Sequence, residues 1–416
     1  MVSKHHGYFL GLTLTESCKT TPSTRTLGNR QRGVALMAAL ILMLAVVMVL
    51  GNIFYRHQMD VSQAGAAAHT DQALLLALSV ESWARQQVSS ALQSNGQPFN
   101  SDTVDHLGEN WAQAVPMLPI EGGVIRGCIQ DLQARFNINN FAIYSKKNAA
   151  AFTADASVGP LDPINTVVIW QNLLELLDFP VTPQRSAALA DWLDKDADMI
   201  NSWGAEQPYY GNLQPPRTVA NGPMTDSSEL AAVVGYSVFD VQYLTHFVSA
   251  LPVRSAVSPA VIPTPININT ASDVVLQALG GSRALEFFEV IQQARSDNRH
   301  FQTVAELHSE LSVGLAMSLP EIQAQWPAAL LDVKSSFFQL YLEVLLGDIH
   351  LQVKSTIDLR NSKRAAPAVI AREVSVVPKV MPEIVVEDEA PLQGAAEDTD
   401  ENQVYRVQTA CEVIGV

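Results

Sequence analysis

The hydrophobic pattern of the chain begins with one long apolar run. Val34 to Leu50 is 17 apolar residues without a break, and residues 53–55 are apolar again. A helix needs about 20 apolar residues to span a bilayer, so 34–55 predicts a transmembrane helix. No proline follows until Pro98, and apolar residues continue at helical spacing. We therefore expect a single N-terminal helix over 34–95.

The segment before this run distinguishes three interpretations. A secretory signal peptide would have a shorter apolar core with a small-residue cleavage site directly after it, whereas the nearest such site, 64–66, lies well past the run. An ordinary membrane anchor fits the length. A type IV prepilin-like leader fits more closely, because a basic, polar segment ends at Gly33 and the apolar run starts at Val34. A prepilin peptidase would cut between these two residues on the cytoplasmic side, where Arg30 and Arg32 favour placing the N-terminus.

Strand patterns lie on both sides of a long helical region. Gly122-Gly123 separates apolar runs at 117–120 and 124–132, and Gly347-Asp348 separates 337–346 from 349–357, so both predict β-hairpins. Further strands are expected at 369–377 and 404–416. Helical patterns occupy 173–177, 186–193, 229–234, 239–250, 271–279 and 284–295.

This order predicts an α+β fold whose sheet is split by an inserted helical domain. The expected parts are a leader at 1–33, the helix at 34–95, a first α+β part at 96–158, the insertion at 159–333 and a second sheet part at 334–416. The stretch 383–402 carries eight acidic residues and no Lys or Arg, which is typical of a solvated, flexible loop.

Composition narrows the class of protein. The 416 residues include 26 Lys and Arg against 42 Asp and Glu, a net charge of −16, which argues against a protein held on nucleic acid by phosphate contacts. Loss of the leader would leave 21 against 41, or −20. The nine histidines are scattered, and no nucleophile elbow or phosphate-binding loop occurs, so we expect no enzymatic activity. Cys128 and Cys411, the cysteines left after cleavage, could pair in an oxidising compartment.

An acidic run raises the question of a metal site. Asp194, Asp196 and Asp198 alternate after a predicted helix, and Glu206 follows. Carboxylates that converge repel one another unless a hard cation lies between them, and calcium accepts six to eight oxygens in irregular geometry. The spacing is not that of an EF-hand, whose Gly and Glu positions hold Met and Ala here. From spacing alone, a calcium site and a solvated turn both stay open.

The helical region contains a second motif. Residues 268–272 precede an apolar helix, Gly280-Gly281 and another helix, a pattern that resembles a helix-hairpin-helix module. We expect Thr270 to cap the first helix. Such modules bind the DNA backbone in many proteins, but this hairpin offers one nearby cation, Arg283, in an acidic chain. A packing role is the simpler interpretation.

Short segments along most of the mature chain resemble one protein family. They are residues 31–36, 109–113, 121–123, 131–140, 191–196, 204–206 with Tyr209-Tyr210, Pro215-Pro216, 228–230 and 266–272. In this order they resemble the minor pseudopilin K (GspK) of bacterial type II secretion systems. The leader and the acidic stretch lie outside the resemblance.

The resemblance implies a pseudopilin fold, in which a long N-terminal transmembrane helix packs on an antiparallel sheet and an all-α insertion carries helix-hairpin-helix (SAM-like) modules. It implies a single-pass protein of the inner membrane with its C-terminal domain in the periplasm. The implied partners are minor pseudopilins I and J, other pseudopilins, the prepilin peptidase, and secreted substrates or the outer-membrane secretin.

Members of this family bind calcium in the acidic region, so calcium is the implied cofactor. The ligands carried over by the resemblance are Asp194, Asp196, Glu206 and Asp226, and the less well matched candidates are Asp198, Glu229 and the Tyr209 carbonyl.

The fifth mature position bears on function. Most pilins carry Glu there, where it can neutralise a neighbour's N-terminal amine, but this chain has Ala38. A subunit at the end of a filament has no subunit above it to neutralise. The implied function is a cap on the tip of the periplasmic pseudopilus that promotes its assembly for export of folded proteins. The alternative is a membrane-anchored helix-hairpin-helix DNA-binding protein of a competence or type IV pilus system. A third possibility, a membrane-anchored periplasmic hydrolase, is disfavoured because the sequence contains no nucleophile–base pattern.

Overall fold

The computed structural model describes residues 32–91, 104–113, 115–143, 164–255, 261–360, 366–377 and Cys411. The chain divides into two compact units, Met1–Gly65 and Ala66–Val416, and each is described by itself. The leader up to residue 31, the acidic stretch 383–402 and the predicted last strand, apart from Cys411, lie outside the described residues.

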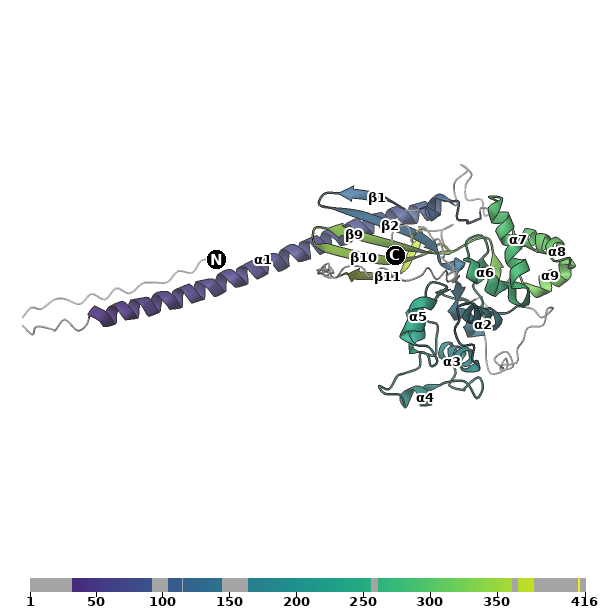
Figure 1. Cartoon of the computed structure of the whole chain (residues 1–416), viewed down its shortest axis with the longest axis horizontal. Coiled ribbons are helices and arrows are strands. Elements are labelled where there is room, and N and C mark those ends of the chain that lie inside the picture. Colours follow the sequence, from purple (N-terminus) through teal and green to yellow (C-terminus); the bar gives the residue numbers. More distant parts are fainter. Residues whose placement is uncertain are drawn as a thin grey trace, which may run out of the picture. The chain divides into compact units, whose positions relative to one another are not determined.

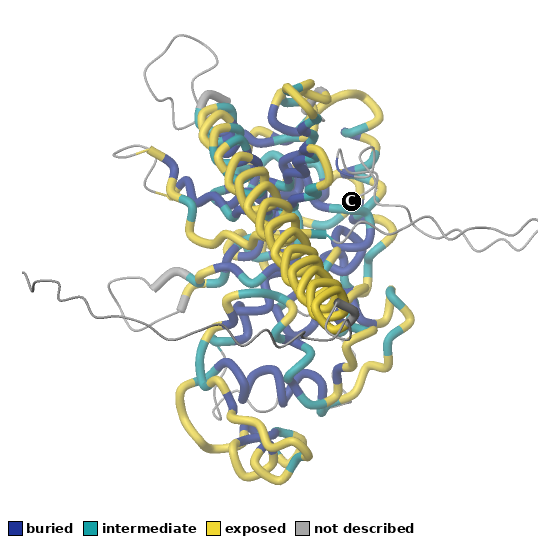
Figure 2. Tube along the Cα trace, turned by 90° about the vertical axis from the view of Figure 1, so that its left-hand side faces the viewer, coloured by how far each residue is buried: buried dark blue, intermediate teal, exposed yellow. Residues whose placement is uncertain are grey.

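The first unit contains the beginning of helix α1 (Arg32–Ala91), the helix that the apolar run predicts. Its side chains from Val34 to Val61 are exposed (Figure 2). One 18-residue window reaches a mean hydropathy of 2.9, and none of that window is buried. By length and composition, this helix can cross a membrane.

The second unit is built on a five-stranded antiparallel sheet in the order β1-β2-β9-β10-β11. The strands are β1 (Val115–Ile120), β2 (Gly123–Asp131), β9 (Phe337–Leu346), β10 (Ile349–Asp358) and β11 (Ala368–Val376). Both predicted hairpins are confirmed, and their turns hold Gly122 and Gly347 at φ values of 79° and 57°, a backbone region that favours glycine. Because β2 and β9 pair across the insertion, the predicted split of one sheet is also confirmed.

One face of the sheet packs against the later part of α1 (Figure 1). Small residues on α1, such as Ala77 and Ala84, are fully buried against strand residues that include Leu340 and Val353. Small side chains let the helix backbone approach the sheet closely. The apolar stripe that the sequence places on this part of the helix is therefore the stripe that forms the core.

Glu81 interrupts that stripe and is 2% exposed. Its carboxylate accepts hydrogen bonds from Arg372 Nε (2.8 Å) and Nη2 (2.7 Å) on β11, and from Ser355 Oγ (2.7 Å) on β10. Burial raises the pKa of Glu81, but these donors outweigh it and hold the pKa below its ordinary value. The ion pair with Arg372 and the hydrogen bond from Ser355 join α1 to two strands at one register.

The insertion has its own core, which includes Trp170, Phe287 and Trp326. Its helices are α2 (Thr166–Leu176), α3 (Pro183–Leu193), α4 (Gln207–Gly211), α5 (Val238–Leu244), α6 (Asp273–Gly280), α7 (Ala284–Ser296), α8 (Val304–Gly314) and α9 (Leu319–Gln325).

Short elements lie within the insertion and in the segment before it. The described 3₁₀ turns are η1 (Asn110–Ala112), η2 (Leu132–Ala134), η3 (Ile138–Ile143), η5 (Ser227–Ala232) and η6 (Gly281–Arg283). The two-residue strand pairs are β3 (Phe136–Asn137) with β4 (Val248–Ser249), β5 (Arg254–Ser255) with β6 (Val261–Ile262), and β7 (Ile266–Asn267) with β8 (Leu331–Asp332).

Two local expectations are wrong. The helix expected over 239–250 ends at Leu244, because Val248 pairs with Phe136 in a short parallel ladder. Thr270 does not cap α6. Ser272 does, by accepting a hydrogen bond from the Val275 N–H, while the Thr270 hydroxyl donates to a carboxylate of the sheet. The helix-hairpin-helix resemblance of α6, η6 and α7 stays a prediction.

That carboxylate belongs to Asp131, the last residue of β2. It accepts hydrogen bonds from Thr270 Oγ1 (2.5 Å), Ser335 Oγ (2.5 Å), Gln133 N (2.7 Å) and Asn267 Nδ2 (3.2 Å). Asn267 and Thr270 belong to the insertion, whereas Ser335 leads into β9. One buried carboxylate therefore ties the sheet to the insertion.

Asp105 extends this network and accepts a hydrogen bond from the Ser335 N–H (2.6 Å). Burial raises the pKa of Asp105 to about 8, and the negative charge of the neighbouring Asp131 adds to the rise. Asp105 therefore keeps its proton at neutral pH in the folded protein.

The Asp105→Asn variant should lose a pH dependence of stability. The pKa of Asp105 is about 8 when folded and near 3.8 when unfolded. The folded state therefore binds the extra proton between these values, and the free energy of unfolding falls as the pH rises. Asparagine cannot ionise and keeps an acceptor for Ser335. Urea unfolding from about pH 5 to about pH 8.5 should increasingly favour the variant, by at most ~1.4 kcal/mol per pH unit. A constant difference between the two proteins would contradict the assignment.

Candidate metal site

The candidate site is formed by the loop between α3 and α4. Thr182 caps α3 and Pro183 occupies its first position, both of which favour a helix start, and the helix ends at Leu193 with Asp194 as its C-cap. Residues 194–206 then form an irregular loop, and Glu206 is the N-cap residue of α4.

Asp191 closes this loop from within α3. Its side chain is fully buried, and its two oxygens accept from the Ile200 and Ala205 N–H groups, both at 2.8 Å. Burial raises its pKa to about 7, although these two donors oppose the rise. Gly204 makes room for it, because a Cβ at that position would lie 2.0 Å from Asp191 Oδ2.

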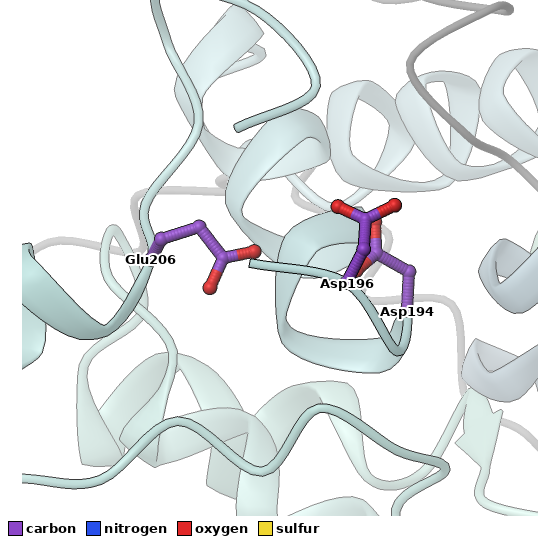
Figure 3. Close-up of side chains that lie close together, drawn as sticks. All are labelled: Asp194, Asp196 and Glu206. Carbon is purple, nitrogen blue, oxygen red and sulfur yellow. The ribbon is translucent and has the colours of Figure 1, made fainter. Parts of the chain in front are cut away.

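Three carboxylates converge on the closed loop. Asp194, Asp196 and Glu206 each offer an oxygen within 4.8 Å of the others. Figure 3 shows Asp194 and Asp196 side by side, with Glu206 facing them from the other end of the loop. Glu206 is 2% exposed, and both its oxygens, together with Asp194 Oδ1, are buried without a hydrogen-bond donor. Buried carboxylate oxygens without a donor are rare in proteins, because their desolvation is costly.

The electrostatics of this cluster favour a cation. Burial raises the pKa of Asp194 to about 7, with further contributions from the charges of Asp196 and Glu206. Burial likewise raises the pKa of Glu206 to about 7, and the Asp191 carboxylate adds to the rise. A hard divalent cation would remove this repulsion and supply the missing partners. The all-oxygen donor set fits calcium, which would draw its remaining ligands from backbone carbonyls and water.

The other predicted ligands do not join this group. Asp226 caps η5 by accepting from the Ser228 N–H (2.8 Å) and lies 3.7 Å from Lys354 Nζ. Glu229 accepts from the Thr225 N–H and hydroxyl at the same cap.

Asp198 lies within the loop, and Tyr209 lies in α4. The Asp198 backbone N–H donates to Asp196 Oδ1 (2.9 Å), and the Tyr209 carbonyl accepts from the N–H of Asn212, the C-cap residue of α4. Their role as ligands stays a prediction, as do those of Asp226 and Glu229.

Asn221 contacts the metal-site loop and is not among the residues that the sequence predicts there. Its side-chain amide donates to the Asp196 carbonyl (2.9 Å), and its Oδ1 is buried without a donor. Its φ of 44° places it in the left-handed region, where asparagine is favoured among non-glycine residues. The Asn-Gly pair at 221–222 is a turn signal, and it is the sequence feature that could have drawn attention to this segment.

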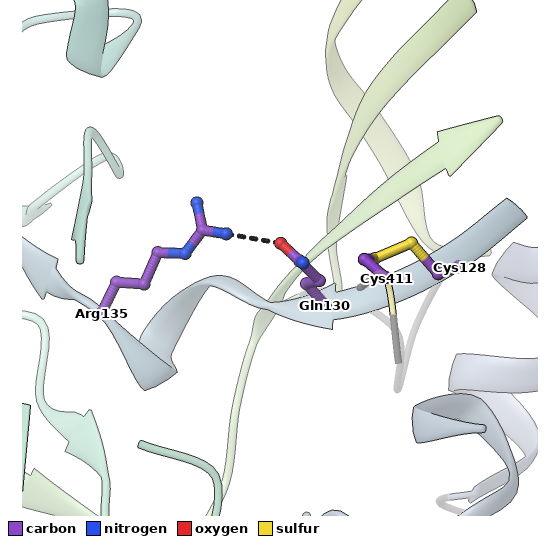
Figure 4. The surroundings of a disulfide bond; sticks show 4 residues. All are labelled: Cys128, Gln130, Arg135 and Cys411. Carbon is purple, nitrogen blue, oxygen red and sulfur yellow. Dashed lines mark hydrogen bonds between the residues drawn. A yellow bond between two sulfur atoms is a disulfide. The ribbon is translucent and has the colours of Figure 1, made fainter. Parts of the chain in front are cut away.

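The remaining predicted residues lie elsewhere. Cys128 on β2 and Cys411 form a disulfide with a Cα–Cα distance of 5.4 Å, and both are fully buried (Figure 4). On the same strand, Gln130 accepts a hydrogen bond from Arg135. Gly33, Val34 and Ala38 lie in the first part of α1, where Val34 and Ala38 are exposed.

Comparisons with known proteins indicate the family of this chain. A family model described as type II secretion system (T2SS), protein K matches residues 134–253. The type II secretion system protein K of Pseudomonas aeruginosa is 30% identical over 356 residues, which cover 83% of this chain and 93% of the relative. The protein K of Aeromonas hydrophila is 29% identical over 332 residues, which cover 79% and 92%.

A solved structure shares the fold. It is a chain in the crystal structure of the GspK-GspI-GspJ complex from enterotoxigenic Escherichia coli. The match has a TM-score of 0.59 at 23% identity and covers 75% of this chain and 99% of that one.

The chain has an apolar N-terminal helix that continues onto a split antiparallel sheet. Together with these relatives, this architecture defines a minor pseudopilin, a structural component of a type II secretion system. Within that class, the chain belongs to the type II secretion system protein K family.

The closed loop yields a prediction for Gly204→Ala. The new Cβ would displace Asp191 Oδ2 and break its hydrogen bond to the Ala205 N–H. We expect a loss of about 1–3 kcal/mol in the free energy of unfolding, as for other broken buried hydrogen bonds. Gly211→Ala is the matched control, because its Cβ would meet only Gln207 Nε2 at 3.6 Å. Equal stability of the two variants in urea titrations would refute the role given to Gly204.

Proposed function

We propose that this protein caps the tip of the periplasmic pseudopilus in complex with minor pseudopilins I and J, and promotes pseudopilus assembly for the export of folded proteins across the outer membrane. The helical insertion carries the proposal. It occupies the chain between β2 and β9 and has a core of its own. A domain of this size would obstruct side-by-side packing within a thin filament, but it suits the filament's end.

Two further observations support the proposal. The fifth residue after Gly33 is Ala38, so the chain lacks the carboxylate with which most pilins neutralise the N-terminal amine of a neighbour. A terminal subunit has no need of that carboxylate. The structural relative named above was crystallised with GspI and GspJ, which identifies the corresponding pseudopilins as the expected partners.

Membrane insertion and processing belong to the same proposal. The exposed first part of α1 would anchor the precursor in the inner membrane, with Ala66–Val416 facing the periplasm. A prepilin peptidase would then remove the leader between Gly33 and Val34. Secreted substrates or the secretin would meet the subunit only at the pseudopilus tip.

Calcium binding is the second part of the proposal. Asp194, Asp196 and Glu206 would hold the ion, and Asp191 would keep the loop closed around it. The donorless, buried oxygens of Glu206 are the observation in its favour. The ion would stabilise the insertion and supply no chemistry of its own.

DNA binding is the weaker alternative. Besides Arg283, residues 268–299 contain two cations, Arg295 and Arg299, and both lie at the far end of α7 from the predicted hairpin. Arg295 donates to the carbonyls of Ile268 and Ala271, and Arg299 pairs with Glu310 at 2.9 Å. Cations held in this way contribute little to phosphate binding in an acidic chain.

Electron microscopy of sheared pseudopili tests the tip position. Gold-labelled antibodies against residues 159–333 should decorate one end of each filament, because this insertion leaves no place for the subunit in the shaft. An antibody against the major pseudopilin serves as the control and should decorate the whole length. Label from the first antibody repeated along the shaft would overturn the proposal.

Calcium titration of the purified full-length protein tests the metal site. At a calcium concentration 100 times the dissociation constant, the ion should add about 2.7 kcal/mol to the free energy of unfolding. The Asp194→Asn/Asp196→Asn double variant should lose this gain and its calorimetric binding signal. Glu175→Gln, on the exposed end of α2, is the control and should keep both. A double variant that is equally less stable in calcium and in chelator would exclude an ion at this loop.

A further inference from the structure

Helix α5 presents an aromatic surface to solvent. Phe239 is 83% exposed and Val238 is 60% exposed. Tyr243 lies one turn after Phe239 on the same side of the helix and is 45% exposed. Val181, in the connection between α2 and α3, is 43% exposed. These four residues are called the α5 surface.

Ring contacts join the two segments of this surface. The Phe179 ring, two residues before Val181, lies 6.1 Å from the Tyr243 ring, and Tyr243 lies 5.7 Å from the buried Phe247. The α5 surface therefore continues into the core of the insertion and is not a set of isolated apolar residues.

The helix that carries Phe239 is fixed in place. Ser237 and Asp240 form a reciprocal cap at its start. Asp240 also accepts from Arg185 Nη2 (2.8 Å), and the Arg185 guanidinium lies 5.7 Å from the centre of the Phe179 ring. Because these contacts hold both sides of the α5 surface, the outward position of Phe239 is part of the folded structure. Exposed aromatic side chains on an anchored helix are enriched in protein interfaces.

The charged residues within the two segments of this surface are acidic. Residues 164–182 and 237–244 contain Glu175, Asp178 and Asp240 and no Lys or Arg. Glu175 and Asp178 are exposed and lie four residues and one residue before Phe179, and the Glu175 carbonyl accepts from the Asp178 N–H (3.0 Å). Two cations lie near these segments, and both have partners. Arg185 is paired with Asp240, and Arg135 donates to the Thr245 carbonyl and to Gln130. An incoming partner therefore meets an apolar centre with negative charge at its edge.

We propose that the α5 surface is a docking site for a protein segment that inserts an apolar or aromatic side chain beside Phe239 and carries Lys or Arg next to it. Aromatic burial would supply the affinity, and the acidic edge would select basic flanks. The same edge disfavours a second copy of this acidic chain and an anionic lipid surface. The proposal goes beyond the capping function and does not depend on the tip position or on calcium.

Site-specific photo-cross-linking in secreting cells tests this proposal. A benzophenone amino acid replaces Phe239 in the full-length protein, and in a matched control it replaces Val313 on α8, which is 84% exposed. Both positions are exposed, so neither change should disturb folding, which thermal unfolding of the purified proteins verifies. Position 239 should yield a cross-linked peptide with an aliphatic or aromatic residue within three positions of Lys or Arg. Position 313 should yield at most a tenth as much.

A charge variant sharpens the test. Asp178→Lys should lower the yield at position 239 at least fivefold, whereas Glu286→Lys, an exposed acid on α7, should leave it unchanged. Equal yields at positions 239 and 313 would overturn the proposal. So would cross-links to other copies of the chain or to lipid, captured peptides without basic flanks, or equal effects of the two charge variants.

Discussion

The carboxylate of Asp131 ends β2 at the point where the chain leaves the sheet, and four donors from three segments satisfy it. A charge or polar group buried to this degree is tolerated only when its partners are in place. Thr270 and Asn267 can reach it only when the insertion is docked, and Ser335 only when the chain has returned toward β9. Asp131 therefore joins the insertion to the sheet at the point where the chain passes from one to the other.

Buried asparagines repeat this principle within the insertion and in the segment that leads into it. Asn139 both donates to and accepts from the backbone of Met224, Asn140 does the same with Thr264, and Asn269 does so with Phe301. Each side-chain amide replaces the two hydrogen bonds of a strand pair. These contacts let long, irregular segments pack internally without leaving backbone groups unpaired, and Asn139 fixes the segment that leads to Asp226.

Sequence patterns predicted the parts of the fold that depend on local signals. The apolar run, the two glycine turns and the β-branched strands each act over a few residues, so α1 and the sheet hairpins could be located in advance. The converging carboxylates Asp194, Asp196 and Glu206 were also within reach, because they lie within one loop. The hydrogen bond of Thr270 could not be predicted in this way, because its partner Asp131 is 139 residues away. Arg372, whose partner Glu81 is 291 residues away, and the asparagine contacts were missed for the same reason. Asn221 was missed although its Asn-Gly turn is a local signal.

The bond between Cys128 and Cys411 has a topological consequence. It closes a covalent ring that contains the insertion, β9, β10 and β11. A single backbone cut by a protease anywhere in this ring leaves the two fragments covalently joined. A piece can leave only after a second cut in the ring, or after the disulfide of the cut chain is reduced. The subunit can thus be nicked at an exposed loop and remain one molecule.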